Sequence, residues 1–287
     1  MSATKVSLIV TTYNWPEALA SVLRSIKRQS MLPVEVIIAD DGSNPATRML
    51  IEQTANNFPC ALHHIWQQDL GFRVARCRNL AIAASSGDLL VLLDGDMVLH
   101  PRFIEDHCNA SRQGYFIQGS RVLLVAAGSQ KLLTNTDTTV TFFSPGIKRR
   151  RNTLRLPLLS KLWRLLSAGQ KRGGIKTCNQ SWWRTDLVKL NGFDERMISW
   201  GKEDDELAAR AFHAGLIRQD VKYSALAFHI WHQERHHDGK SPNQKYLDET
   251  NALAKTWAEN GLDKHLSHVE AIDNPDLRLK HKTNPIS

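Results

Sequence analysis

Short apolar runs alternate with amphipathic stretches along the first hundred residues. The run "VSLIVTT" (6–12) carries no charge and is rich in β-branched residues, which predicts a buried strand. The stretch "EALASVLRSIKRQ" (17–29) has the helical period, and we expect Asn14 to cap this helix and Pro16 to lie near its first turn. The alternation continues, with strands predicted at 33–41, 61–67 and 88–96, and helices after Ser43 or Asn44 and over 73–86.

This alternation predicts an α/β fold, with a Rossmann-like, mostly parallel sheet covered by helices on both faces. In such sheets ligands bind beyond the carboxyl ends of the strands. The segments Thr11–Asn14, Asp40–Ser43 and Asp94–Asp96 follow three predicted strands and should therefore share one rim. The pattern predicts a nucleotide site at this rim.

The second half of the chain is less regular. Strands are predicted at 115–125 and within "IKTCNQSWWRTD" (175–186), followed by a short helix. Further helices are predicted at 203–214 and at about 242–258, before a polar tail. We see no internal repeat.

The net charge of +8 comes from one segment. Residues 138–185 contain eleven Lys and Arg, whereas all 29 Asp and Glu lie elsewhere, so the rest of the chain is slightly acidic. Within this segment the leucines of "LPLLSKLWRLL" (156–166) fall on one side of a predicted helix. Two alternatives stay open: an interfacial helix on an anionic membrane, or a core-packing helix with solvated Lys and Arg. A nucleic-acid patch is a third reading, but no recognised motif accompanies the charge, so no nucleic-acid partner is expected.

The sequence gives little sign of a membrane span or of disulfides. No run of 18 apolar residues is present, and the apolar part of "MSATKVSLIVTTYN" is short, so we expect neither a spanning helix nor a signal peptide. The four cysteines lie far apart without a Cys-x-x-Cys pair, which disfavours a disulfide framework and a zinc ribbon. We expect a cytoplasmic protein, located at the cytoplasmic face of the inner membrane if the basic segment binds lipid.

Two groups of carboxylates could carry chemistry. Asp94 and Asp96 follow a buried strand, which suits Mg²⁺ or Mn²⁺ with substrate phosphates, although an Asp-Gly hairpin turn is the alternative. The stretch "WGKEDDE" (200–206) places four consecutive carboxylates at a helix start. They could simply complement the helix dipole, or one could accept a proton.

Several stretches together resemble a known family. "VSLIVTTYNWPEAL", "EVIIADDGS", "GFRVARCRNLAI" and "LLVLLDGDMV" occur in an order and spacing similar to the nucleotide-sugar-binding half of family 2 glycosyltransferases, which have the GT-A fold. "TCNQSWWRTDLVKLNGFDERMISWGKEDDELAARAFHAG" and "AFHIWHQE" resemble the acceptor half of the galactosyltransferase-type branch. The resemblance implies one domain over 1–262, with a nucleotide-sugar half at about 1–100 and a catalytic half at 101–262. The latter contains the basic insert 145–174, and the polar tail covers 263–287.

The resemblance implies a UDP-sugar donor and assigns residues to it. Asp41 would hydrogen-bond the uracil ring, which favours UDP over GDP or CMP, and Asp94 would hold the ribose or the metal. The remaining donor contacts would be Thr11 and Tyr13 at the nucleobase and Arg73, Arg76 and Arg78 near the diphosphate, where guanidinium groups suit phosphate.

The resemblance also implies a divalent metal, Mn²⁺ or Mg²⁺, held by Asp96 with His232 and His229. His236 and His237 receive no role.

Asp204 would be the catalytic base, and Glu203 would bind acceptor hydroxyls or hold Asp204 in place. The acceptor and sugar contacts would be Trp200, as a platform for a sugar face, together with Gly201, Asn179 and Gln180. The branch usually has a small residue or Met after the Asn, so Gln180 is a departure expected to alter the donor-sugar pocket.

The sequence thus favours an inverting, metal-dependent glycosyltransferase. It would move a hexose or N-acetylhexosamine from a UDP-sugar to a saccharide acceptor, such as a lipid-linked surface-polysaccharide or lipopolysaccharide precursor. Two alternatives stay open: a non-catalytic basic protein that binds polyanions or nucleic acid, and a sugar-phosphate nucleotidyltransferase. The latter would require a glycine-rich loop after the first strand, where "TTYNWPEA" has no Gly.

Overall fold

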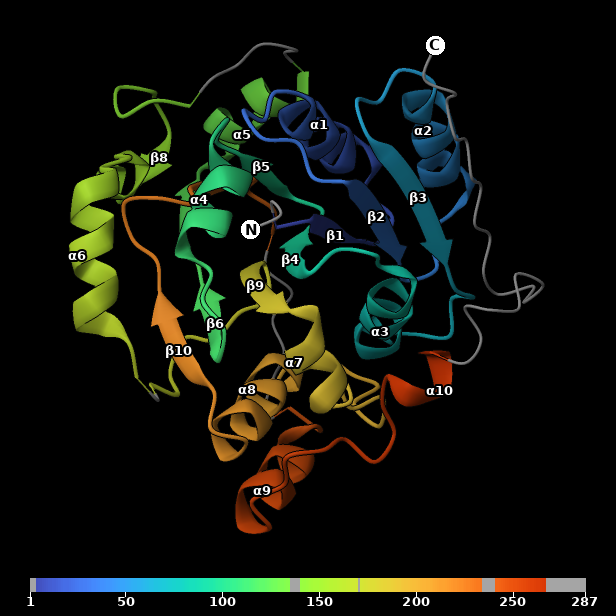
Figure 1. The fold of residues 1–287 in the computed structure, drawn as a ribbon. Helices are drawn as coiled ribbons and strands as arrows, with labels where there is room; N and C mark the ends of the chain where they lie inside the picture. Colours follow the sequence, from blue (N-terminus) through green and yellow to red (C-terminus); the bar gives the residue numbers. More distant parts are fainter. Residues whose placement is uncertain (1–3, 135–139, 170, 234–240, 267–287) are drawn as a thin grey trace.

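A seven-stranded sheet forms the centre of the computed structural model, which describes residues 4–134, 140–169, 171–233 and 241–266. The strand order is β10-β6-β9-β4-β1-β2-β3 (Figure 1). The strands are β1 (Val6–Thr12), β2 (Glu35–Asp40), β3 (Ala61–Trp66), β4 (Leu89–Asp94), β6 (Tyr115–Gln118), β9 (Asn179–Trp183) and β10 (Ile217–Asp220).

Pairing in this sheet is parallel except at one strand. β1 lies between β2 and β4, with Thr11 opposite Ala39 on one side and Asp94 on the other. β9 runs antiparallel to both β4 and β6. The predicted mostly parallel α/β fold is therefore confirmed, and the predicted strand at 6–12 has the bounds that the sequence indicated.

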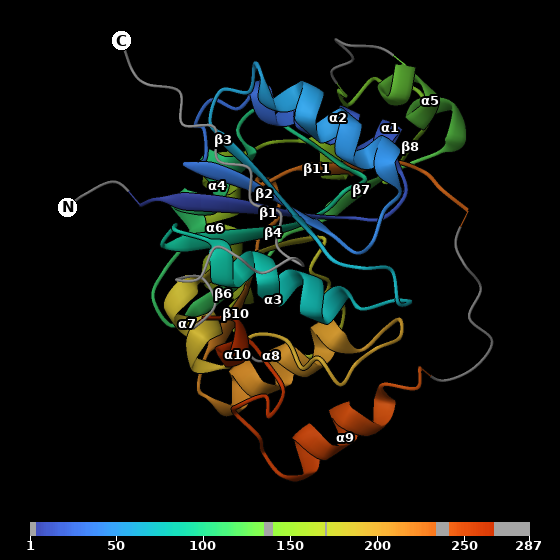
Figure 2. The same ribbon diagram turned by 90° about the vertical axis from the view of Figure 1, so that its right-hand side faces the viewer.

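Helices cover both faces of the sheet (Figure 2). The helices on one face are α1 (Pro16–Lys27), α2 (Pro45–Ala55) and α4 (Phe103–Ala110); those on the other are α3 (Val74–Ala84), α7 (Arg184–Lys189) and α8 (Glu203–His213).

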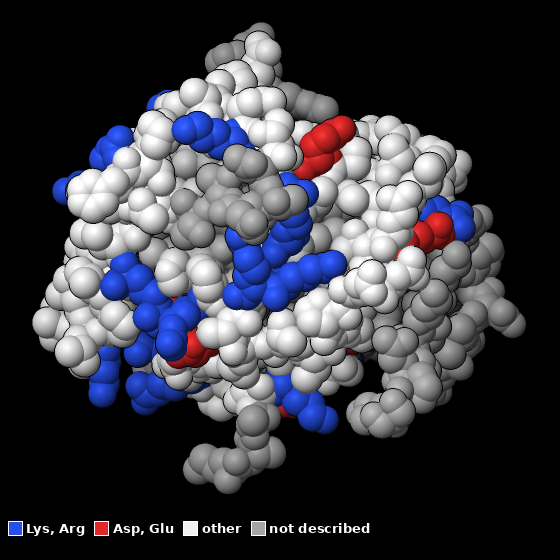
Figure 3. Space-filling view, turned by 90° about the horizontal axis from the view of Figure 1, so that it is seen from above, with Lys and Arg blue, Asp and Glu red and all other residues white. Residues whose placement is uncertain are grey.

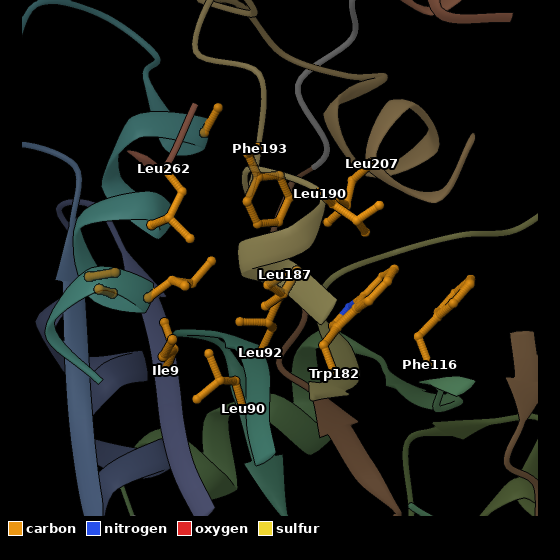
Figure 4. Close-up of a cluster of buried hydrophobic side chains, with 14 of the residues drawn as sticks. Ile9, Leu90, Leu92, Phe116, Trp182, Leu187, Leu190, Phe193, Leu207 and Leu262 are labelled. Carbon is orange, nitrogen blue, oxygen red and sulfur yellow. The ribbon is translucent and has the colours of Figure 1, made fainter. Parts of the chain in front are cut away.

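Alternate side chains of a strand enter different cores, as the two-residue period requires. Leu8 and Val10 pack against α1, whereas Ile9 packs on the α3 side. Figure 4 shows this second cluster, in which Trp182 stacks on Phe116 with ring centroids 4.2 Å apart. The residues before and after 100 share these cores, so they form one packed unit.

A second, four-stranded sheet has the order β5-β11-β7-β8. Its strands are β5 (Met97–Leu99), β11 (Ala227–His229), β7 (Arg121–Leu124) and β8 (Ile147–Lys148). The chain passes from the large sheet to this one between Asp94 and Met97. β4 and β5 thus belong to different sheets, so the Asp-Gly hairpin considered for this turn is wrong.

Several local expectations differ from the structure. Asn14 does not cap α1: the N-cap is Trp15, without a side-chain cap, and the Asn14 side chain instead accepts a hydrogen bond from the Asn44 N–H. Asn44 does cap α2, by accepting from the Ala46 N–H. The strand expected at 115–125 is two strands in two sheets, because the chain turns after Gln118.

The remaining elements lie in the second half of the chain. The helix expected at about 242–258 is shorter, since α9 ends at Ala252. One more helical turn covers residues 263–266, which were expected to belong to the polar tail. The rest of that tail, 267–287, lies outside the described residues. These elements are α5 (Ala126–Thr134), a 3-10 helix (Arg150–Thr153), α6 (Pro157–Ser167), α9 (Gln244–Ala252) and α10 (Asp263–Leu266).

Within the described ranges, no helix is long and apolar enough to cross a bilayer. The expectation of a core-packing helix at 156–166 is wrong: α6 lies at the edge of the molecule, and its leucines are exposed (Figure 1).

Candidate functional site

The carboxyl ends of β1, β2 and β4 meet at one rim, as expected from the parallel pairing. A tight turn at Gly95 connects this rim to the second sheet. The Gly95 N–H donates to the Thr11 carbonyl at 2.7 Å, and a Cβ at Gly95 would lie 2.9 Å from that oxygen. Only glycine allows this approach without displacing the backbone. The turn therefore holds Asp94 beside β1 and places Asp96 beyond the large sheet.

Pairing of β5 with β11 brings two histidines to Asp96. His229 lies opposite Met97, and the Ile230 N–H donates to the Asp96 carbonyl at 2.9 Å. Asp96 Oδ2 is 3.2 Å from His229 Nε2 and 3.4 Å from His232 Nε2. The metal-binding atoms of these three residues lie within 4.8 Å of one another.

The charge and bonding of Asp96 suit a cation site. Burial would raise the pKa of Asp96, but hydrogen bonds to His229 and His232 outweigh it and hold the pKa at about 2. Its Oδ1 is buried and has no hydrogen-bond partner among the described residues. One carboxylate and two imidazoles therefore fit a divalent ion. Imidazole ligands favour Mn²⁺ over Mg²⁺, which prefers oxygen.

Arg78 lies at the centre of the rim. Its side chain, from α3, is buried, and its Nε donates to Thr11 Oγ1 at 3.4 Å. Nη2 lies 3.4 Å from Asp94 Oδ1, and Nη1 lies 3.3 Å from Asp204 Oδ1. One guanidinium thus connects a carboxylate at the end of β4 to a carboxylate in the first turn of α8.

Asp204 is fixed from a second side by Thr177. The Thr177 N–H donates to Oδ2 at 2.9 Å, and its hydroxyl donates to Oδ1 at 2.8 Å. The carboxylate of Asp204 is therefore held in one orientation by three donors, while about a fifth of its side chain remains exposed.

Glu203, the preceding residue, has the opposite environment. It is 8% exposed, and its Oε2 has no hydrogen-bond partner within the described part of the chain. Burial, followed by the negative charge of Asp204, raises the pKa of Glu203 to about 7, against a partial offset from Arg78. Two adjacent carboxylates thus differ in their surroundings: Asp204 is held by three donors, whereas Glu203 is buried with one oxygen unbonded.

Asp205 and Glu206 do not reach the rim. Asp205 pairs with Lys202 at 3.1 Å, and Glu206 forms a buried ion pair with Arg210 at 2.7 Å. Both carboxylates thus have partners of their own away from the rim.

The residues assigned to the nucleobase and diphosphate lie beside the ends of β1 and β2. The Tyr13 hydroxyl donates to Asp69 at 3.0 Å and leaves its ring exposed. Asp41 is buried and accepts from the Arg73 N–H and from Gln67, and burial raises its pKa.

Arg76 donates to Gln67 at 2.7 Å, and the Arg73 guanidinium donates to the Gln68 carbonyl. The structure thus brings Asp41, Arg73 and Arg76 together around Gln67.

Two models of known protein families match this chain. A family model described as "Glycosyl transferase family 2" matches residues 7–158, more than half of the chain. The chain belongs to glycosyl transferase family 2. A second model, described as "N-terminal domain of galactosyltransferase", matches residues 169–233. Both models describe proteins of glycosyl transfer, and neither describes a sugar-phosphate nucleotidyltransferase or a polyanion-binding protein.

Relatives and a solved structure resemble this family 2 protein over most of its length. Chondroitin synthase from Escherichia coli is 27% identical over 78% of this chain and 34% of its own. Validoxylamine A glucosyltransferase from Streptomyces hygroscopicus subsp. limoneus is 28% identical over 80% of this chain and 52% of its own. The structure of S. aureus TarS, 18% identical, covers 93% of this chain and 42% of its own with a TM-score of 0.54, which supports the GT-A fold. The chain thus spans between a third and about half of these proteins.

Two residues assigned to the sugar lie elsewhere in this family 2 glycosyltransferase. Asn179 is fully buried and bonds to His107 and to the carbonyls of Ser120 and Ala225. Gln180 is also fully buried, between Gln118 and the indole N–H of Trp182. Both side chains are buried and hydrogen-bonded to protein groups, so this structure places neither of them at the open rim. Gln180, the residue that departs from the family pattern, therefore forms hydrogen bonds in the protein interior.

Trp200 and Gly201 lie on the loop before α8. Trp200 is exposed, and Gly201 has a φ of 92°. Ser241 and Asn243 donate hydrogen bonds to the carbonyls of this loop. The loop is thus anchored by the segment before α9 while its indole stays open to solvent.

Sequence reasoning missed three residues at the site. Thr177 orients Asp204, and Gln67 joins Asp41 to Arg76. Trp231, which lies between His229 and His232 in the chain, is exposed. An aromatic residue in the "HIWH" stretch was the one available signal, whereas Thr177 and Gln67 carry no motif.

Proposed function

We propose that this chain transfers a hexose or an N-acetylhexosamine from a UDP-sugar to a hydroxyl of a saccharide acceptor, with inversion. The single observation that carries this proposal is the convergence at one rim. There the Asp96–His229–His232 cluster lies next to the Asp94–Arg78–Asp204 ion pairs. A leaving-group site and a candidate base are therefore adjacent.

The donor side of the proposal rests on the residues around Gln67. The Tyr13 ring is exposed for stacking on a base, and Asp41 offers carboxylate oxygens for the uracil N3–H. Arg73 and Arg76 bring positive charge to the same region, which suits a diphosphate. A UDP-sugar satisfies these groups, with Asp94 near the ribose.

A divalent ion at Asp96, His229 and His232 would supply Lewis-acid stabilisation of the diphosphate leaving group. The protein's contribution is to orient these ligands through the β5–β11 pairing. It also supplies Arg78, which adds a positive charge next to Asp94.

The acceptor hydroxyl requires a base on the opposite side. Its oxygen forms a bond to the anomeric carbon while the bond from that carbon to the phosphate oxygen breaks, and the hydroxyl proton goes to the Asp204 carboxylate. Thr177 and Arg78 hold the Asp204 carboxylate in one orientation before it accepts the proton. Glu203, whose pKa burial raises to about 7, can in its protonated form donate a hydrogen bond to another acceptor hydroxyl or keep Asp204 in place.

The acceptor is proposed to be a growing polysaccharide or a lipid-linked saccharide. Two relatives are named chondroitin synthase and hyaluronan synthase, after polysaccharides. The exposed rings of Trp200 and Trp231 offer faces on which pyranose C–H groups can pack. Transfer would take place in the cytoplasm, at the cytoplasmic face of the inner membrane for a lipid-linked acceptor.

A UDP-release assay tests this function. The chain would be incubated with Mn²⁺, an oligosaccharide acceptor, and UDP-Glc, UDP-Gal, UDP-GlcNAc or UDP-GalNAc in turn. We expect one donor to release UDP well above the others, and only slowly without acceptor. If no UDP-sugar stabilises the protein in a thermal shift with Mn²⁺ while a GDP- or CMP-sugar does, the donor class is wrong.

A further inference from the structure

The helix α6 is attached to the protein through its polar side. Ser160 is buried and shares a 2.6 Å hydrogen bond with Ser224. Four residues later, Arg164 donates to the Asn109 carbonyl at 2.8 Å, and Ser167 donates to the Asp220 carbonyl at 3.2 Å. The spacing of 160, 164 and 167 defines one helix face, so this face of α6 is its inner side.

The outer side of α6 is apolar. Leu158 is 87% exposed, Leu165 is 73% exposed and Leu166 is 77% exposed, and Leu162 is also exposed. The helix forms the outer edge of the molecule at the left of Figure 1, and no other described element covers it. We call these four leucines the α6 face. An amphipathic helix normally buries its leucines, and the reversed orientation here indicates an interaction surface.

Exposed basic residues lie on α6 and in the segment just before it. Lys161 is exposed on the helix, and the exposed Lys148, Arg149 and Arg151 lie just before it in the chain. The view in Figure 3 shows Lys and Arg gathered across the centre and left of the molecule, with few Asp and Glu. The segment 138–185 itself contains no acidic residue.

Nearby carboxylates do not cancel this charge. Asp106 pairs with Arg155 at 2.6 Å, and Asp220 pairs with Arg218 at 2.7 Å. The free positive charge around the α6 face therefore remains available to an anionic partner.

We propose that the α6 face docks on an anionic lipid bilayer, with its leucines in the acyl boundary and the surrounding Lys and Arg at the headgroups. Exposed Leu next to Lys and Arg is the composition of an interfacial helix. The Lys222 ammonium lies 4.5 Å from the Trp163 indole centroid. In the proposed orientation this pair would lie at the level where the headgroups meet the acyl chains.

A second copy of the chain fits this face less well. In a two-fold dimer the same patch meets itself, so the basic residues of both copies would lie opposite like charges. An anionic surface satisfies the leucines and the charges together. The proposal concerns a surface separate from the rim and does not depend on the sugar that is transferred.

Vesicle co-sedimentation tests the proposal on the full chain. Vesicles of phosphatidylcholine alone would be compared with vesicles that also contain phosphatidylglycerol. One variant combines Leu158→Gln, Leu165→Gln and Leu166→Gln. Its matched control combines Leu32→Gln, Met49→Gln and Leu253→Gln, three exposed apolar residues elsewhere. A charge variant combines Lys148→Gln, Arg149→Gln and Arg151→Gln.

We expect the wild type to bind anionic vesicles at least about tenfold more strongly than neutral ones, because each basic residue near the surface adds to the binding. The α6 variant should lose about tenfold or more in partitioning, and the charge variant should lose its preference for phosphatidylglycerol. The matched control should bind as the wild type does.

Two results would overturn the proposal. One is equal partitioning of the wild type and the α6 variant. The other is a wild-type dimer in light scattering that the α6 variant converts to a monomer, without vesicle binding by either, which would assign the face to a second copy. Because the vesicles contain no saccharide, neither result bears on the transferase assignment.

Discussion

Arg78 and Asp204 form a 3.3 Å ion pair between residues 126 positions apart in the chain. The same guanidinium reaches Asp94 at 3.4 Å, so the end of β4 and the start of α8 are connected through one side chain. This connection keeps the proposed donor half and the proposed base in a fixed relation.

Replacing Arg78 with Lys should reduce turnover by about 10²-fold, because an ammonium can approach one carboxylate but not both in the fork geometry of a guanidinium. The change preserves the positive charge, so unfolding should shift only modestly. The kcat with a fixed UDP-sugar and acceptor is the measurement. Arg112→Lys, at a guanidinium that rests on Tyr115, is the matched control and should leave kcat unchanged. A wild-type kcat for Arg78→Lys would refute the connecting role.

Asp204→Asn should lower kcat by about 10²-fold or more while UDP still stabilises the protein with Mn²⁺, because the amide cannot accept the proton. Asp205→Asn changes the neighbouring carboxylate of the same helix turn, which is paired with Lys202, and should retain activity. Single-turnover kinetics separate the chemical step from binding. Equal losses in the two variants would assign the effect to the helix start and not to a base.

The raised pKa of Glu203 predicts a pH-dependent stability. At pH values below 4.5, the ordinary pKa of a Glu carboxyl, Glu203 is protonated in both the folded and unfolded states, so its ionisation does not change the free energy of unfolding. Between 4.5 and about 7 the unfolded chain ionises while the folded protein holds the proton, so stability is lost as pH rises.

Glu203→Gln should therefore be more stable than the wild type at pH 8 by about 1–3 kcal/mol, and nearly equal to it at pH 4.5, from the size of the shift. Urea unfolding at the two pH values, with chelator present, measures the difference. A stability difference that does not change with pH would contradict the buried, proton-holding environment of Glu203.

Asp96→Ala should abolish the additional stabilisation that Mn²⁺ gives to UDP binding, because the carboxylate and its orphan Oδ1 are removed. His229→Ala and His232→Ala should each weaken Mn²⁺ binding, by about 10-fold or more from the loss of one imidazole ligand. Isothermal titration with Mn²⁺ in the presence of UDP gives the affinities. Undiminished Mn²⁺ binding by Asp96→Ala would move the metal elsewhere.

The sequence predicted those parts of the molecule that local pattern determines. The strand at 6–12 was recognisable because its residues form an uncharged, β-branched run. The Asp94–Asp96 turn was recognisable because its two carboxylates directly follow an apolar run. Contacts over long distances were not recognisable. Nothing local to Thr177 indicates that its hydroxyl meets Asp204, because that contact depends on how β9 and α8 pack.

The orientation of side chains was equally hidden. Periodicity showed that the leucines of α6 share one side, but not that Ser160 and Arg164 bind the protein and leave those leucines outside. Gln180 illustrates the same limit. The family pattern predicted a place for Gln180 in the sugar pocket, whereas its side chain is buried and hydrogen-bonded to Gln118 and Trp182.

Trp200→Ala tests the acceptor side of the site. The indole is exposed on a loop whose carbonyls are held by Ser241 and Asn243, so its removal should leave the loop in place. We expect the KM for the acceptor to rise by up to about 10-fold with a smaller change in kcat, because an aromatic contact contributes about 0.5–1.5 kcal/mol of binding that ground and transition states share. Trp163→Ala on α6, assayed with a soluble acceptor, is the matched control. A loss of kcat at unchanged acceptor KM would instead place the indole at the reacting centre.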